Sequence, residues 1–176
     1  EELRRGAYDV DARIADMDLA GIAVSLNFPS ALWGFAGRVF SAMADAEVGL
    51  ACLRAYNDWM IDDWCGAYPD RFVACQLPWL VAANEIRRNA ERGSTCVAFS
   101  ENPEKLGLPS IHSGYWEPFF AACAETGTVI NLHVGSSSEI AQPSSDSPHS
   151  VANALFGMNS MMATTDWLFS QATIRH

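Results

Sequence analysis

The chain has 176 residues, 49% of them hydrophobic, so it can bury one substantial core and is too apolar to be disordered. Its formal net charge of −10 at pH 7 argues against nucleic acids and anionic membrane surfaces as partners, because both select basic patches. No apolar run approaches the roughly 20 residues of a membrane span, and the five cysteines form no Cys-x-x-Cys pair, so we expect a cytoplasmic protein with reduced thiols.

Helical patterns and short apolar runs alternate along the chain. The first helix is expected to be capped by Asp9 or Asp11 and to end at Gly21. Pro69 marks a turn before the second strand, and Gly93 and Gly127 end two later helices. The predicted helices span residues 10–19, 47–68, 81–92, 115–125 and 151–169, and the predicted strands span 22–28, 71–76, 95–100 and 128–133.

The predicted strands are continuously apolar, which indicates a parallel sheet covered by helices on at least one face. The fold class is therefore α/β, in a single domain over residues 1–176. No Gly-x-Gly-x-x-Gly motif follows the first strand and no Walker loop occurs, so the usual signature of nucleotide-binding doubly wound folds is missing. The alternative is a flavodoxin-like, non-enzymatic binding module that is complete as it stands.

Polar residues stand where each predicted strand ends. They are Asn27, Gln76, Glu101 and His133, and parallel strands would bring them to one rim of the sheet. His133 is the most informative of the four, because it ends an apolar run and opens into a Gly/Ser loop. A core histidine bonded to a backbone carbonyl is the equally weighted structural alternative.

Five short segments, taken in order, resemble the amidohydrolase-related family of metal-dependent hydrolases and decarboxylases, which includes aminocarboxymuconate semialdehyde decarboxylase. Single pieces are weakly specific, whereas the full series over about residues 10–170 is highly specific. The segments are AYNDW at 55–59, YPDRF at 68–72, QLP at 76–78, EIRR at 85–88 and LHVG at 132–135.

The resemblance implies a partial (β/α)8 TIM barrel whose present strands are two to five of eight. It implies a divalent metal at the carboxyl rim, zinc first and manganese second, held in the family by a His-x-His pair, a further His and an Asp. His133 matches the fifth-strand histidine of that set. The other ligands and the catalytic acid or base would lie outside residues 1–176, so we expect a fragment that is inactive by itself.

Four further residues are candidate substrate contacts: His112, Trp116, Glu101 and Asn27. Each has a structural alternative. Glu101 more readily caps its own loop or faces solvent, His112 fits a surface loop equally well, and Trp116 lies on a helix that is mainly core. Asn57, on an apolar helix face, is expected to make a structural hydrogen bond to a loop.

From this resemblance we expect an amidohydrolase-like enzyme that hydrolyses or non-oxidatively decarboxylates a small aromatic or carboxylated molecule. We expect neither a nucleic-acid nor a membrane partner, and a homodimer when the protein is full length. A metal-free barrel that keeps only the scaffold is a third possibility. If the half-barrel is right, Val24, Leu26, Val97, Phe99, Ile130 and Leu132 should be partly uncovered.

Overall fold

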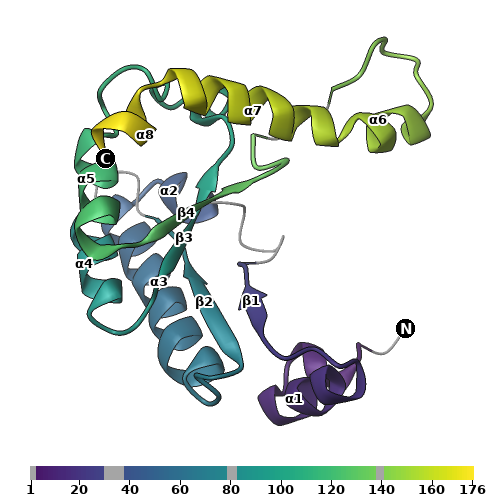
Figure 1. The fold of residues 1–176 in the computed structure, drawn as a ribbon, viewed down its shortest axis with the longest axis vertical. Coiled ribbons are helices and arrows are strands. Elements are labelled where there is room, and N and C mark those ends of the chain that lie inside the picture. The colour runs from purple at the N-terminus through teal and green to yellow at the C-terminus, as the bar shows by residue number, and fades with distance from the viewer. Residues whose placement is uncertain (1–2, 30–37, 79–82, 138–140) are drawn as a thin grey trace.

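A computed structural model describes residues 3–29, 38–78, 83–137 and 141–176. Its centre is a four-stranded parallel sheet whose strands follow one another in chain order (Figure 1). The β2–β3 pairing spans two register pairs, compared with three between β1 and β2 and five between β3 and β4. The strands are β1 (Ser25–Asn27), β2 (Phe72–Gln76), β3 (Cys96–Ser100) and β4 (Val129–His133).

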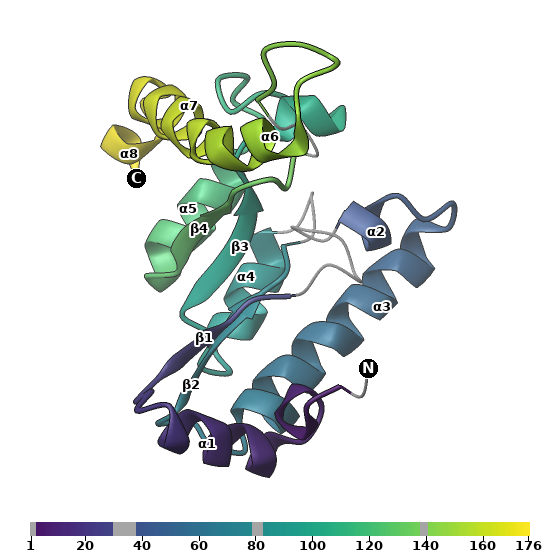
Figure 2. The ribbon, with the colours of Figure 1, turned by 90° about the vertical axis from the view of Figure 1, so that its right-hand side faces the viewer.

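Helices α3, α4 and α5 pack along one face of the sheet, while α7 lies across its carboxyl end (Figures 1 and 2). This is the arrangement of one half of a (β/α)8 barrel, with the opposite face of the sheet left open. The described helices are η1 (Arg5–Ala7), α1 (Val10–Leu19), α2 (Arg38–Ser41), α3 (Ala46–Asp58), η4 (Trp59–Cys65), α4 (Ala83–Ala90), η5 (Pro103–Leu106), α5 (Glu117–Thr126), α6 (His149–Leu155), α7 (Gly157–Phe169) and α8 (Ala172–Arg175).

The apolar residues between the sheet and the helices gather in two main clusters. One joins β2 to α1 and η4 through residues such as Met17, Met60 and Phe72. The other joins β3 to α5 and α7, with Phe99 stacked on Phe119 at a ring-centroid distance of 4.9 Å. On the helix-covered face the two halves of the sheet therefore have largely separate cores, whereas Cys75, Cys96 and Ala98 join β2 to β3 on the other face.

The long helix predicted over 47–68 is present over residues 46–65, three residues shorter at its end, and it changes its winding. Asp45 caps α3, its carboxylate accepting hydrogen bonds from the backbone N–H groups of Glu47 at 3.0 Å and Val48 at 3.2 Å. From Trp59 the helix continues as the π-helical η4, which apolar spacing does not distinguish from an α-helix. Of the two predicted caps of α1, Asp9 is the one that accepts a hydrogen bond, from Ala12 N–H.

Several predicted boundaries are wrong. The first strand covers three residues, not seven, and Ile22 is exposed before it begins. The single helix predicted over 151–169 is two helices, α6 and α7, with Phe156 between them, and α6 starts earlier, within the predicted loop. The second, third and fourth strands each start one residue later than predicted.

The prediction of uncovered residues is correct for Val24 and Leu26, which are exposed, and wrong for Val97 and Phe99, which are buried. Val97 and Phe99 point to the helix-covered face, where α5 and α7 bury them. A continuously apolar strand hides this distinction, because its sequence lacks the alternation that separates the two faces.

The flavodoxin-like alternative is also wrong. A doubly wound sheet reverses its strand order at a switch point and carries helices on both faces. The described sheet runs β1-β2-β3-β4 without reversal.

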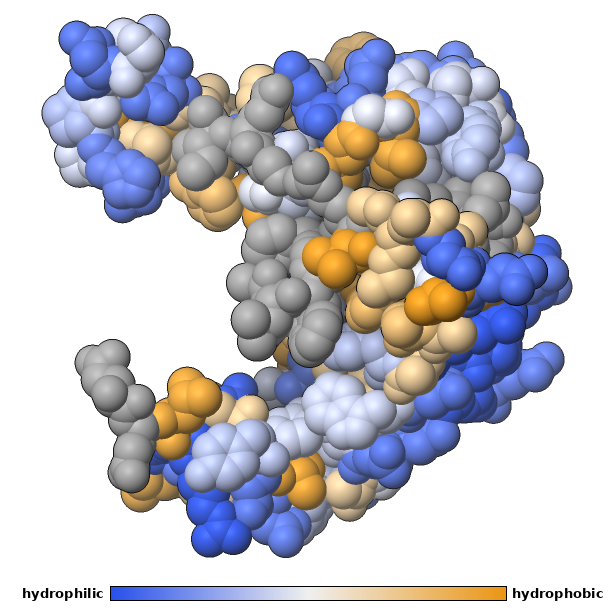
Figure 3. Space-filling model, turned by 180° about the vertical axis from the view of Figure 1, so that it is seen from behind, coloured by the Kyte–Doolittle hydropathy of each residue, from blue (hydrophilic) through white to orange (hydrophobic). Residues whose placement is uncertain are grey.

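In the space-filling view from behind, a concavity opens between α6 and the segment around α1 (Figure 3). In the part of the chain that the structure describes, no helix has the length and apolarity that crossing a membrane requires.

Candidate active site at the carboxyl rim

His133 ends β4 and lies on the open face of the sheet. Its ring meets Phe28 edge-on at a centroid distance of 5.6 Å. Its Nδ1 lies 3.0 Å from the carbonyl oxygen of Val134. A protonated Nδ1 donates to that carbonyl, and in the neutral ring this tautomer leaves the lone pair on Nε2, the form in which histidine binds a metal.

Glu101, which directly follows β3, binds the loop that follows His133. Its side chain is buried, and its Oε1 accepts hydrogen bonds from Gly135 N–H at 3.0 Å and from the Ser137 hydroxyl at 2.5 Å. Ser137 N–H donates to Oε2 at 3.1 Å, and the Ser136 hydroxyl donates to the same oxygen. Glu101 therefore caps a loop, as one of its structural alternatives predicted. The loop is the one that follows β4, not the one that contains Glu101.

Gly135 gives that loop its shape. Its φ of +85° is a conformation that residues with a side chain rarely adopt. A Cβ added there would also stand 3.1 Å from the ring of Phe156. The conformation of the Gly/Ser run after His133 thus lets the N–H groups of Gly135 and Ser137 point to the Glu101 carboxylate, while Ser136 N–H donates to the His133 carbonyl oxygen at 3.1 Å.

Beneath His133 the open face carries Asn131, Cys75 and Cys96. The Asn131 amide nitrogen lies 3.9 Å from the Cys75 sulfur, and Cys75 and Cys96 are register partners on β2 and β3. Spacing alone could have placed Asn131 here, because residues two apart on a strand share a face. The facing of the two cysteines depends on the β2–β3 register, which the sequence does not reveal.

Asn27 and Gln76 stand at strand ends as predicted, but their side chains turn toward the helices. Asn27 is the register partner of Ala74, which belongs to the core beneath η4, and its amide donates to the Ser25 carbonyl oxygen at 3.0 Å. Gln76 Oε1 accepts a hydrogen bond from Asn89 of α4 at 2.8 Å. The role of Asn27 in substrate binding stays a prediction, without support from this geometry.

His112 and Trp116 lie in the loop and cap before α5. His112 Nε2 is 2.7 Å from Asp166 Oδ1, which ties this exposed loop to α7. Trp116 is 2% exposed, and its indole N–H donates to the Pro109 carbonyl oxygen at 2.8 Å. Trp116 therefore occupies the core, while a substrate contact by His112 stays a prediction.

A buried polar network closes the end of β2 against α3 and α4. Asn57 donates to the Leu77 carbonyl oxygen at 3.0 Å and accepts from Leu77 N–H at 2.8 Å, which confirms its predicted structural role. Burial opposes ionisation of Glu85, but hydrogen bonds from Arg88, Asn57 and Arg54 outweigh it and hold the pKa of Glu85 below its usual value. This network positions α3 and α4 against the end of β2, and it lies away from the open face of the sheet.

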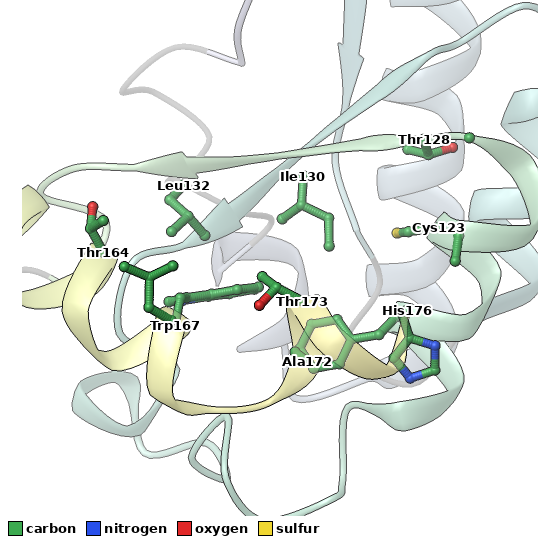
Figure 4. Close-up of a pocket in the computed structure, with 13 residues that line it drawn as sticks. Cys123, Thr128, Ile130, Leu132, Thr164, Trp167, Ala172, Thr173 and His176 are labelled. Carbon is green, nitrogen blue, oxygen red and sulfur yellow. The ribbon is translucent and has the colours of Figure 1, made fainter.

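An apolar cavity of about 480 Å³ lies on the other side of β4 (Figure 4). Ile130 and Leu132 line it from β4, Trp167 from α7 and Ala172 from α8. Because side chains alternate along a strand, Leu132 and His133 point to opposite faces. The cavity is therefore separate from the rim around His133.

The residues that the structure describes form no group of three or more His, Cys, Asp or Glu side chains able to hold a metal ion. His133 is suited to be one ligand by its position and tautomer, whereas catalytic zinc sites use three protein ligands.

The amidohydrolase family model matches residues 3–176, nearly the whole chain. The chain belongs to the amidohydrolase family. This result confirms the family to which the sequence segments pointed, and the parallel sheet with its consecutive strand order is the corresponding partial barrel.

Solved structures show the same fold. One is a variant of 5-carboxyvanillate decarboxylase from Novosphingobium aromaticivorans with bound manganese and 3-methoxy-4-hydroxy-5-nitrobenzoic acid, at 20% identity and a TM-score of 0.54. A second structure of that decarboxylase, complexed with manganese and 4-hydroxy-3-methoxy-5-nitrobenzoic acid, matches equally well. The match covers 86% of this amidohydrolase chain and 42% of the decarboxylase chain. Among curated proteins, none matches.

Proposed function

We propose that this amidohydrolase chain is part of a metal-dependent enzyme that hydrolyses or non-oxidatively decarboxylates a small aromatic or carboxylated molecule. The observation that carries the proposal is His133, a histidine at the carboxyl end of a parallel strand, on the open face of the sheet. Family membership and the fold shared with a manganese-containing decarboxylase support it.

His133 would be one ligand of a divalent metal, through the ring nitrogen opposite the one that faces Val134. The metal would supply Lewis-acid chemistry toward a substrate carboxylate or a water molecule. Zinc is our first assignment because imidazole suits it well, and manganese is the second because the similar decarboxylase binds it. The resemblance assigns the remaining ligands and the acid or base to positions outside these 176 residues.

Glu101 would hold the loop that follows His133. Near His133, Asn131 lies on the same face of β4 and Phe28 packs against the imidazole ring. We further propose that His112, Asn27 or Trp116 contributes to substrate binding only after local rearrangement, because each now has an internal partner. A cytoplasmic location and a homodimeric assembly of the full-length protein complete the proposal.

The test compares His133→Ala with His112→Ala in the full-length protein, with metal content measured by elemental analysis and turnover on aromatic carboxylic acids. Loss of one of about four ligands should lower metal occupancy at least tenfold in the His133 variant. His112, paired with Asp166 at the surface, should leave occupancy unchanged.

Retention of metal and turnover by the His133 variant would show that this histidine is a core residue bonded to a carbonyl. A wild-type full-length protein that binds neither zinc nor manganese would instead identify a metal-free barrel, the remaining alternative. Elemental analysis of the wild type separates these two outcomes.

A further inference from the structure

Two cysteines stand side by side on the open face of the sheet, and the proposed function uses neither of them. Cys75 and Cys96 are register partners, and both are buried, 0% and 5% exposed. Neighbouring strands lie about 4.8 Å apart. A disulfide requires roughly 4.4–6.8 Å between Cα atoms, so the two backbones already stand at a suitable separation.

The two thiols also interact with one another. The Cys96 thiol donates to the Ala74 carbonyl oxygen at 3.5 Å, and the Cys75 sulfur lies 3.9 Å from the Asn131 amide nitrogen. Interaction with Cys96 and burial raise the pKa of Cys75, whereas interaction with Cys75 lowers the pKa of Cys96. Cys96 therefore ionises more readily than Cys75 and is the better nucleophile of the pair.

We propose that Cys75 and Cys96 form a reversible disulfide between β2 and β3 when a peroxide oxidises the pair. The Cys96 thiolate attacks one oxygen of hydrogen peroxide. An S–O bond forms, the O–O bond breaks, and the departing hydroxide takes up a proton to become water.

The Cys75 sulfur then attacks the sulfenic sulfur of Cys96. The S–S bond forms, the S–O bond breaks, and hydroxide leaves with the Cys75 proton as a second water molecule. The two thiols lose two electrons in all, and the peroxide that accepts them is reduced to two water molecules.

The disulfide would cross-link the sheet where its pairing is shortest. Cys75 and Cys96 form the first of the two register pairs between β2 and β3. A covalent bond at this point closes a loop that contains α4, so it restricts the unfolded chain and should raise the melting temperature by several degrees.

The experiment treats the folded wild-type chain with hydrogen peroxide, blocks the remaining thiols and maps peptides by mass spectrometry without reduction. We expect the chain to lose the mass of two hydrogen atoms, a cross-linked peptide pair containing Cys75 and Cys96, and reversal by dithiothreitol. Cys75→Ser should abolish the cross-link, and Cys123→Ser should retain it, because Cys123 is a buried thiol in the helix-covered core.

A cross-link between other cysteines would overturn the proposal, as would oxidation that stops at separate sulfinic acids. So would folded protein that resists peroxide under conditions in which unfolded chain forms disulfides readily. The wild-type peptide map decides between these outcomes even if a serine variant fails to fold.

Discussion

At the scale of single residues, Glu101 has the strongest influence on the rim. Its carboxylate replaces solvent as the acceptor for a loop whose backbone N–H groups point inward at Gly135 and Ser137. Hydrogen bonds to a charged acceptor contribute about 1.5–3 kcal/mol each, and donors left buried without a partner are costly. Glu101 is therefore a positioning residue for the segment that continues His133.

We predict that Glu101→Ala lowers the free energy of unfolding by about 2–4 kcal/mol, because several buried donors lose their acceptor. The amides of Gly135 and Ser137 should become mobile, with NMR order parameters falling from about 0.85 to below about 0.6. Glu104→Gln, an exposed glutamate three residues away, is the matched control and should change neither quantity. Unaltered order parameters in the Glu101 variant would contradict the role of Glu101 in holding this loop.

The sequence identifies His133 because a histidine between an apolar run and a Gly/Ser loop is a local pattern. It does not identify the partner of Glu101, because the hydrogen bonds join residues 34 to 36 positions apart. Such contacts depend on the pairing of β3 with β4, which brings Ser100 opposite His133. Side-chain facing at Asn27 and Gln76 was unpredictable for the same reason.

At the scale of elements, Glu85 of α4 pairs with Arg88 of the same helix at 2.6 Å and joins α4 to α3 through its ion pair with Arg54 at 3.2 Å. The carboxylate is 1% exposed, so its charge is stabilised by these partners and by Asn57 in place of water. Removing one member of such a network leaves the others buried without compensation.

The lowered pKa of Glu85 predicts acid lability of the α3–α4 contact. A carboxyl whose folded pKa lies below its unfolded value of about 4.3 adds stability above that pH and loses it as the pH falls through the folded pKa. Wild-type protein should therefore lose melting temperature more steeply than Glu85→Gln between about pH 5 and pH 3. If the melting temperatures of the two proteins fell equally over this pH range, the predicted contribution of Glu85 to stability would be ruled out.

Helix positions were predictable because apolar spacing, the Asp9 cap and glycine stops are local signals. The π-helical winding of η4 and the division of the last helix at Phe156 were not, since both keep an apolar stripe compatible with one continuous helix. The face of the sheet to which each strand side chain points was the least predictable property, because buried parallel strands lack the alternation of apolar and polar residues.

At the scale of the whole molecule, the open face of the sheet is the dominant surface feature. Val24 and Leu26, exposed by 53% and 41%, lie at its β1 edge. An uncovered apolar face and unpaired strand edges favour association with other apolar surfaces.

We predict that the 176-residue chain binds a hydrophobic dye and associates as its concentration rises. Replacing Val24 and Leu26 together by serine should at least halve the dye fluorescence. Ile174→Ser, which changes a still more exposed apolar residue on α8, should have a smaller effect. A monomer that binds no dye would show that the face is covered in solution.

The two separate cores and the two-pair β2–β3 ladder have a consequence for how the native state opens. Cooperative units of a protein coincide with groups of elements that share a core. The segment from α1 to β2 and the segment from α4 to α8 should therefore unfold locally with different free energies. In deuterium exchange, the amides of β1 would then become labile in one step, while those of β3 and β4 persist until global unfolding.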